Sequence, residues 1–121
     1  MREVKIGSQN YTRIVAVDEP GHGNACHQYN VETIPQVIDT PIAMVGQVSF
    51  QNGPVKEFGV NGLHQEDLLS IVLDRLQSFQ AGEFKCRENA LAITKIEEAM
   101  HWLNHRTTAR RNRGVEGTSV K

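Results

Sequence analysis

The chain has 121 residues, a formal net charge of −1 and an apolar share of 39%, which fits one globular domain or a small domain with an appendage. This composition excludes a disordered chain, and the chain is too short for a large enzyme cleft. No apolar run reaches the ~20 residues of a membrane span, and the first residues lack the apolar stretch of a secretion signal, so we expect a cytoplasmic protein.

The first half of the chain shows the alternation of apolar and polar residues that is typical of β-strands. We expect strands at Tyr11–Val17, near Cys26–Val31, at Ala43–Phe50 and at Val55–Val60. Between the last two lies Asn52-Gly53, a dipeptide that supplies the φ > 0 residues of a tight hairpin turn. The sequence therefore predicts a small antiparallel sheet over residues 1–60.

After residue 60 the apolar period changes from two residues to about 3.6, which indicates helices. We expect one helix at about Gln65–Gln80 and a second at about Lys85–Arg111. Gly82 is placed to close the first helix as the glycine after its C-cap, and a short turn then reverses the chain. The predicted fold class is α+β, with a β-rich part over 1–60 followed by a long helical hairpin and a basic tail over 61–121.

Apolar residues lie on more than one side of both expected helices. In the first helix the stripe Leu69, Val72, Leu76 and Phe79 is widened by neighbouring apolar residues. The second helix spans roughly 35–40 Å, and two rods joined by a short turn cannot bury so much apolar surface in one small domain. We therefore expect hairpins from several chains to pack together in an oligomer.

Positive charge gathers at the C-terminal end. Residues 106–121 carry one acid against five bases, which are Arg106, Arg110, Arg111, Arg113 and Lys121. A nearly neutral chain with one basic end indicates a local anion site rather than the broad positive surface of a duplex-DNA binder.

The hairpin also carries recognisable segments at fixed spacing. The most specific are NGL at Asn61–Leu63, EDLL at Glu66–Leu69, DRL at Asp74–Leu76, FQAG at Phe79–Gly82, REN at Arg87–Asn89 and HWLNHRT continuing to RGVEGT. These segments together cover about half of the chain. Over them, the hairpin resembles the helical-hairpin domain of a group of phage nucleotide sponges. With the β-rich part in front of it, the chain resembles the first Thoeris anti-defence family.

The resemblance implies a non-enzymatic phage protein that acts without a cofactor in the cytoplasm of the infected bacterial host. In that family the ligand is an isomer of cyclic ADP-ribose (gcADPR), which TIR-domain Thoeris proteins make as an immune signal. Capture without degradation starves the effector of that signal. The resemblance further implies cyclic di- and trinucleotides as additional ligands, and a homo-oligomer that is expected to be a hexamer.

Such a ligand presents an adenine, two riboses and a doubly negative diphosphate, so its receptor needs a stacking surface, a base-reading group and cations. Phe79, at the end of the first helix, and Asn89, one turn into the second, are candidates to hold the base. Arg106 and Arg110 lie four residues apart on one face, as a diphosphate clamp requires. The resemblance assigns ligand contacts to the same four positions.

The two candidate pairs are far apart along one helix. Asn89 and Arg106 are seventeen residues apart, or about 25 Å, so they cannot share a pocket within one chain. We expect the tip of one hairpin to meet the Arg106/Arg110 end of another, which forms identical pockets at subunit boundaries.

Each of these residues also has a purely structural interpretation. Phe79 continues the apolar stripe, Asn89 is placed to cap the second helix, and Arg106 and Arg110 suit the negative end of a helix. Two other functions accordingly stay open: a nucleic-acid-binding module that uses the basic end, which the small number of cations disfavours, and an oligomer with only a structural role.

Other chemical sites are not expected. His101 and His105 are four residues apart, but no third ligand stands at a suitable spacing for a metal. Cys26 and Cys86 lack CxxC spacing and are expected to be reduced thiols. The sequence contains neither a phosphate-binding loop nor a nucleophile elbow.

Overall fold

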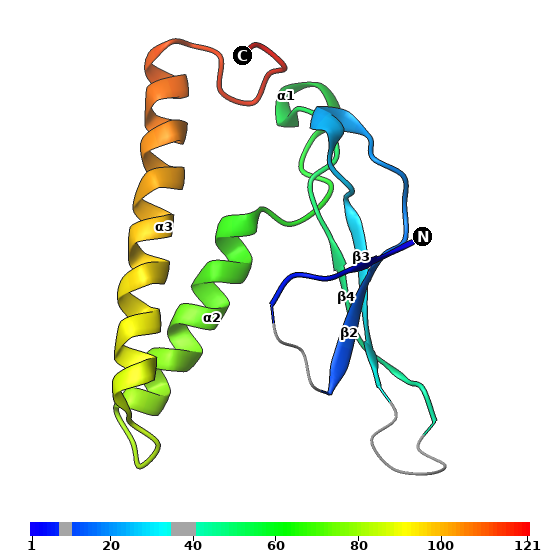
Figure 1. The fold of residues 1–121 in the computed structure, drawn as a ribbon. Coiled ribbons are helices and arrows are strands. Elements are labelled where there is room, and N and C mark those ends of the chain that lie inside the picture. Colours follow the sequence, from blue (N-terminus) through cyan, green and yellow to red (C-terminus); the bar gives the residue numbers. More distant parts are fainter. Residues whose placement is uncertain (8–10, 35–40) are drawn as a thin grey trace. The chain divides into compact units, whose positions relative to one another are not determined.

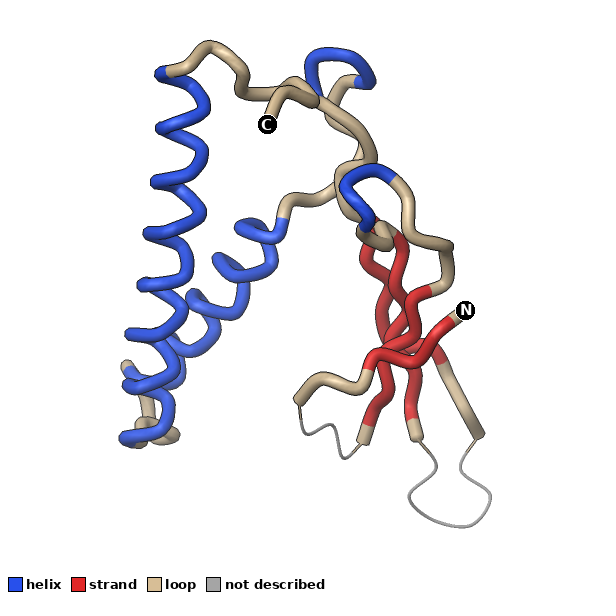
Figure 2. Tube along the Cα trace, turned by 45° about the horizontal axis from the view of Figure 1, so that its top comes forward, coloured by secondary structure: helices blue, strands red, loops and turns tan. Residues whose placement is uncertain are grey.

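The computed structural model describes residues 1–7, 11–34 and 41–121, and Figures 1 and 2 show its elements. The chain divides into two compact units, Met1–Leu63 and His64–Lys121. The first contains a four-stranded sheet and the second a pair of helices. This confirms the α+β fold class, while division into separate domains stays a prediction.

The sheet consists of β1 (Arg2–Val4), β2 (Thr12–Ala16), β3 (Gln28–Thr33) and β4 (Met44–Ser49). The strands follow one another in chain order and each pair is antiparallel. Three of the four expected strands are confirmed, with their ends shifted by one or two residues. The short β1 was not predicted, because three residues are too few to establish an alternating pattern.

The sheet unit buries few side chains. Among the described residues, the buried hydrophobic ones are Ala16 and Cys26, and no large side chain is fully buried. Tyr29 and Phe50 pack edge to face at 5.8 Å between ring centroids. The backbone ladders therefore contribute much of what holds this unit together.

Asp18 fastens the connection between β2 and β3. Its carboxylate accepts hydrogen bonds from the backbone N–H groups of His27 at 2.9 Å and Gln28 at 3.1 Å. These bonds, that from His27 foremost, hold the pKa of Asp18 below its ordinary value of 3.8, because they favour the charged carboxylate.

The prediction of a fourth strand at Val55–Val60 is wrong, because this segment begins with the short helix α1 (Val55–Phe58). Gly53 has a φ of 88°, but Asn52 does not share the positive φ that the expected hairpin turn needs at both positions. The loop is closed instead by amide side chains. Gln51 donates to the carbonyls of Gly53 and Gly59, and Asn61 exchanges two hydrogen bonds with the backbone of Asn52.

The second unit is formed by α2 (Gln65–Gln80) and α3 (Arg87–Asn112). The predicted bounds of α2 are confirmed; the Asp67 carboxylate caps its start by accepting the His64 N–H at 2.9 Å. The helix ends at a cap on Ala81, and Gly82 follows without adopting the left-handed conformation. α3 begins two residues later than predicted, because Cys86 has an extended backbone and serves as its N-cap.

α2 and α3 run in opposite directions and lie side by side near the turn that joins them (Figures 1 and 2). Of the stripe predicted for α2, Leu69 and Leu76 are half-buried, whereas Val72 is exposed and Leu73 takes its place. Other apolar side chains remain open to solvent, among them Ile71 at 63% and Trp102 at 66% exposure. The hairpin thus carries more apolar surface than its own two helices cover.

Candidate functional site

The tip of the hairpin, residues 79–89, contains two of the four predicted ligand-binding residues. Gln80 fastens the turn with both atoms of its amide: its Nε2 donates to the Cys86 carbonyl at 3.0 Å, and its Oε1 accepts the Cys86 N–H at 2.9 Å. This pair of hydrogen bonds closes the turn between α2 and α3 on itself. A fixed turn can present the side chains between its two ends in one arrangement.

Phe79 lies in an aromatic and cationic cluster at the tip. The guanidinium carbon of Arg75 stands 5.1 Å from the centre of the Phe79 ring, a cation–π contact between residues four apart on α2. The ring of Phe84 meets Phe79 edge to face, with centroids 6.3 Å apart and planes at 84°. Phe84 itself is 75% exposed, so the tip offers an aromatic ring to solvent.

Asn89 is connected to the same cluster. It is the third residue of α3 and half-buried, and its amide nitrogen reaches the Phe84 carbonyl at 3.5 Å, the long limit of a hydrogen bond. The structure therefore brings Phe79 and Asn89 to one place, with Phe84 between them. Among the residues that the structure describes, the amide makes only this long contact, so it retains hydrogen-bonding capacity for a partner.

Arg106 is the exposed cation of the opposite end. Within the described residues its side chain makes neither a hydrogen bond nor an ion pair. Trp102, one turn earlier on α3, is also exposed, and its ring lies 5.4 Å from that of His101 and 5.8 Å from that of His105. A guanidinium that is unpaired within the described residues thus stands one helical turn from an exposed indole.

Arg110 is situated quite differently. It is 9% exposed, and in the described part of the chain it is the only buried residue of either α2 or α3. Its guanidinium donates to the Glu116 carboxylate and to the backbone carbonyls of Val115, Thr118 and Val120. All four partners belong to residues 113–121, the C-terminal tail that Figure 1 draws as a curled loop after α3.

The predicted site residues thus form two groups, one at each end of α3. Phe79 and Asn89 belong to the tip, and Arg106 and Arg110 to the opposite end, about 25 Å away along the helix. Ligand contact by these four residues stays a prediction. The sequence analysis missed Arg75, Gln80 and Phe84. The spacing of Arg75 four residues before Phe79, and an aromatic residue inside a turn, are the signals that would have found two of them.

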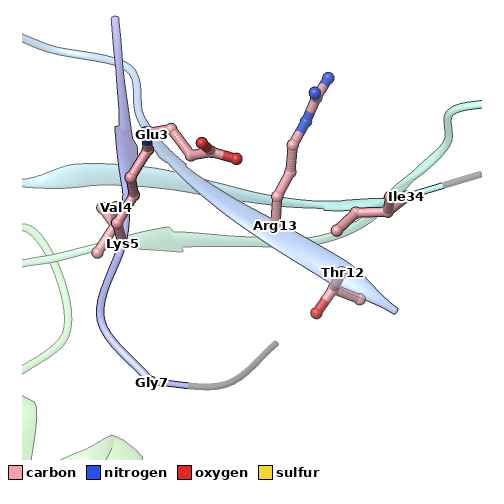
Figure 3. Close-up of a pocket in the computed structure, with 7 residues that line it drawn as sticks. All are labelled: Glu3, Val4, Lys5, Gly7, Thr12, Arg13 and Ile34. Carbon is pink, nitrogen blue, oxygen red and sulfur yellow. The ribbon is translucent and has the colours of Figure 1, made fainter. Parts of the chain in front are cut away.

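A separate pocket of about 240 Å³ lies in the sheet unit. Figure 3 shows the residues that line this pocket. Among them, Glu3, Lys5 and Arg13 place charges of both signs around β1 and β2. Arg13 is already paired with Glu32 at 2.9 Å. Because the pocket borders residues that the structure does not describe, we assign no ligand to it.

Within residues 1–7, 11–34 and 41–121, no group of three His, Cys, Asp or Glu side chains is arranged to hold a metal ion. Cys26 and Cys86 are both free thiols. Among the helices described, none combines the length and the apolar character that crossing a membrane demands.

Comparison with known proteins gives two findings. The family model described as the Acb2/Tad1 hairpin domain matches residues 46–108. The protein named Thoeris anti-defense 1 of Bacillus phage SBSphiJ7 is 62% identical over 74 residues, which is 61% of this chain and 52% of the relative. The chain thus spans about half the length of that relative. The family match includes Phe79, Asn89 and Arg106, and it ends before Arg110 and the tail.

Proposed function

This chain belongs to the family of the Acb2/Tad1 hairpin domain, and from that premise we propose that it is a phage anti-defence protein that sequesters a nucleotide immune signal. The observation that carries the proposal is the family match over the hairpin, together with 62% identity to a Thoeris anti-defence protein. The proposed ligand is the cyclic ADP-ribose isomer gcADPR, bound inside the infected bacterial cell. Cyclic di- and trinucleotides form a second proposed ligand class.

We assign the base to the tip of the hairpin. Phe79 and Phe84 stand at right angles, so a purine that stacks on one ring also meets the edge of the other, a favourable aromatic geometry. Arg75 covers part of Phe79, which favours stacking on the face that its guanidinium leaves open. Asn89 would read the base edge with its amide, which can donate and accept at the same time.

We assign the diphosphate to the arginine end. Arg106 is exposed and unpaired within the described residues, so it can donate two parallel hydrogen bonds to phosphate oxygens without first breaking other contacts. Arg110 was predicted to share this task. Its guanidinium is engaged by the tail, so direct contact with phosphate requires it to give up those bonds. Its part in binding therefore stays a prediction.

The proposal requires assembly. Because the tip and the arginine end of one helix lie about 25 Å apart, a complete pocket needs the tip of one subunit and the arginine end of another. The exposed Ile71, Leu91 and Trp102 supply apolar surface that such packing would cover. The proposed assembly is a homo-oligomer, with a hexamer as its expected state.

The proposed action is sequestration without turnover. The site residues include no paired general base and nucleophile, and capture alone lowers the free signal if binding is tight. Suppression of a scarce signal needs nanomolar affinity, about −12 kcal/mol. We therefore expect no enzymatic activity toward the bound nucleotide.

The test is to mix the protein with gcADPR made by a TIR-domain protein, remove free nucleotide by filtration, denature the complex and analyse what is released. Sequestration predicts depletion of the filtrate and recovery of intact gcADPR after denaturation. Recovery of a degraded product would identify an enzyme instead. If gcADPR stays in the filtrate, the same experiment with cyclic trinucleotides decides whether that second class is the ligand.

A control addresses the two other functions. A salt-sensitive shift of DNA or RNA oligonucleotides in the same concentration range would favour a nucleic-acid-binding module, since counterion release makes such binding fall steeply with salt. An oligomer with only a structural role predicts that none of the nucleotides binds and that replacing Arg106 by alanine leaves anti-defence activity unchanged.

A further inference from the structure

We propose that two copies of this chain pair through an exposed stripe on α3, in antiparallel orientation and about a two-fold axis. The stripe, called the α3 stripe below, consists of Glu88, Leu91, Lys95, Glu98, Trp102 and Arg106. The pairing itself is inferred from spacing, exposure and charge within the second unit. Its link to nucleotide binding rests on the proposed function.

The members of the α3 stripe recur at the spacing of a helix face. The intervals between them are three or four residues throughout, so at 3.6 residues per turn they fall within a sector of about 80°. The half-buried Ile93, Ile96, Met100 and Leu103 lie on another side of α3, with their sector centred about 130° away. The helix therefore has a second face, which the hairpin leaves uncovered.

The α3 stripe is exposed along its length. Trp102 is 66% and Leu91 46% exposed, and the side chains of Lys95 and Glu98 are 74% and 58% exposed. At the two ends, Glu88 and Arg106 make neither a hydrogen bond nor an ion pair within the described residues. Apolar side chains exposed beside unpaired charges are typical of an interaction surface.

The order of residues makes the α3 stripe complementary to itself in the antiparallel direction. Along the helix it presents an acid, an apolar residue and a base, and then an acid, an apolar residue and a base again. A second stripe that runs the opposite way matches Glu88 with Arg106, Leu91 with Trp102, and Lys95 with Glu98, each twice. A parallel pair would place every charge against its own kind, which disfavours that arrangement.

The three matched pairs agree on one register. The midpoint of each pair falls at positions 96–97, and the pairs agree to within one residue, about 1.5 Å along the helix. A single two-fold axis at this point therefore creates all the contacts, as an isologous interface requires. Around the axis, Lys95 and Glu98, already 3.8 Å apart within one chain, meet their copies in a network of four alternating charges.

The same register brings together the two groups of proposed ligand residues. The pairs Leu91–Trp102 and Lys95–Glu98 set the register, and neither contains a proposed ligand residue. In this register, Asn89 of one copy lies at the level of positions 104–105 of the other, about one turn or less from Arg106, and Arg110 lies at the level of the tip. The pairing therefore supplies the contact between tip and arginine end that a complete pocket requires.

Cysteine crosslinking of the full chain tests the direction and the register. Cys86→Ser removes the exposed thiol, and Cys26 is buried. In this background, Glu88→Cys and Arg106→Cys are made as separate variants, at positions that lie about 27 Å apart on one helix. Antiparallel pairing predicts that a short bismaleimide joins the two variants when they are co-expressed and joins neither to itself. Crosslinks of one variant to itself, or none after co-expression, would overturn the proposal.

Exchange of charges at the axis gives a second test. Lys95→Glu gathers four acids there and Glu98→Lys four bases, so each should raise the dissociation constant of the pair about tenfold, because a two-fold interface contains every ion pair twice. The double variant K95E/E98K restores the alternation and should pair like the wild type. Thr94→Glu, at an exposed position outside the stripe, is the control and should also pair normally. Sedimentation at several concentrations measures this, and a double variant that does not recover would refute the register.

Trp102 reports the apolar contact by fluorescence, because the chain has one tryptophan. Leu91 and Trp102 are about 16 Å apart along α3, so a change at Leu91 cannot uncover Trp102 within one copy. At a concentration where the wild type is paired, we expect Leu91→Ala to raise acrylamide quenching to that of the dissociated chain. Thr94→Ala should be quenched like the wild type. Equal quenching of Leu91→Ala and the wild type would contradict the matched pair.

Failure of the proposed function would give a different result, because all three measurements are made without nucleotide. If the crosslink forms and the charge exchange recovers, but the wild type captures neither gcADPR nor a cyclic trinucleotide, pairing through the α3 stripe stands and the sponge proposal falls. If the wild type captures gcADPR and co-expression gives no crosslink, the pocket is assembled through another surface and this pairing is refuted.

Discussion

The two ends of the helical hairpin are both fastened by one side chain that binds backbone groups, but the two fastenings differ in charge and in consequence. At the tip, the neutral amide of Gln80 makes two hydrogen bonds to Cys86 and leaves an aromatic ring exposed on the turn. At the opposite end, the cation of Arg110 makes four hydrogen bonds to the tail and is itself buried.

The difference bears on the proposed binding of the ligand. A neutral fastening leaves the neighbouring Phe79, Phe84 and Asn89 available to a base. At the opposite end, Arg110 is engaged by the tail, whereas Arg106 is exposed and unpaired within the described residues.

The largest effect is expected at the arginine end, where we propose that Arg106 binds the diphosphate. Replacing Arg106 by alanine should raise the Kd for gcADPR about 100-fold, since losing one partner of a close charge pair costs about 2–5 kcal/mol. Isothermal titration calorimetry measures this directly. Arg111→Ala, an exposed arginine on the same helix, is the matched control and should bind like the wild type. Equal losses in both variants would mean that only net charge matters.

A smaller effect is expected at the tip. Phe79→Ala and Phe84→Ala should each raise the Kd about tenfold, because stacking of one base on an aromatic ring contributes about 1–3 kcal/mol. Phe58→Ala, which removes another largely exposed phenylalanine from the sheet unit, is the control. Tight binding by Phe84→Ala would leave Phe79 as the only stacking surface and break the proposed aromatic corner.

Removing the Gln80 amide should have a modest effect on stability. Gln80→Ala removes two hydrogen bonds and should lower the free energy of unfolding by about 1–2 kcal/mol. Chemical denaturation measures it, with the exposed Gln77→Ala as control. Affinity for gcADPR should fall only to the extent that the conformation of the turn changes. An unchanged unfolding free energy in Gln80→Ala would show that the tip holds without its amide fastening.

The smallest effect is expected outside the hairpin, at Asp18 in the sheet unit. The pKa of Asp18 is below its ordinary value because the charged form accepts the His27 N–H. Asp18 therefore adds stability above the unfolded-state pKa, and this contribution is lost as pH falls through the folded-state value. Asp18→Asn should reduce the loss of unfolding free energy at acid pH and leave gcADPR binding near neutral pH unchanged. If Asp18→Asn loses as much unfolding free energy at acid pH as the wild type does, the stabilising role of the Asp18 carboxylate is refuted.

The sequence predicts the hairpin well because its signals are local and repeated. The apolar stripe around Leu69 and Leu76, with Asp67 at the start, fixes the bounds of α2. The segment Val55–Val60 misleads because its alternation is real, yet Gly53 and the amides of Gln51 and Asn61 close the loop in another way. Such side-chain bonds to the backbone leave no periodic pattern.

The candidate site is predictable only in part for the same reason. Phe79, Asn89 and Arg106 stand in segments with a family resemblance, and the structure places them at the two ends as expected. The setting of Arg110 could not be read from the sequence, since three of its acceptors are backbone carbonyls, which every residue has. Only the fold of the tail brings them together.

In the proposed oligomer, each nucleotide site joins the tip of one subunit to the arginine end of another. Mixing a tip-defective variant (Phe79→Ala with Asn89→Ala) and an end-defective variant (R106A) in one oligomer tests this most directly. Either variant alone should bind gcADPR weakly. Mixed oligomers should regain about one wild-type site in four at wild-type affinity, because random assembly pairs an intact tip with an intact end at that frequency. Mixed oligomers, verified by native mass spectrometry, that still bind no gcADPR tightly would contradict the account.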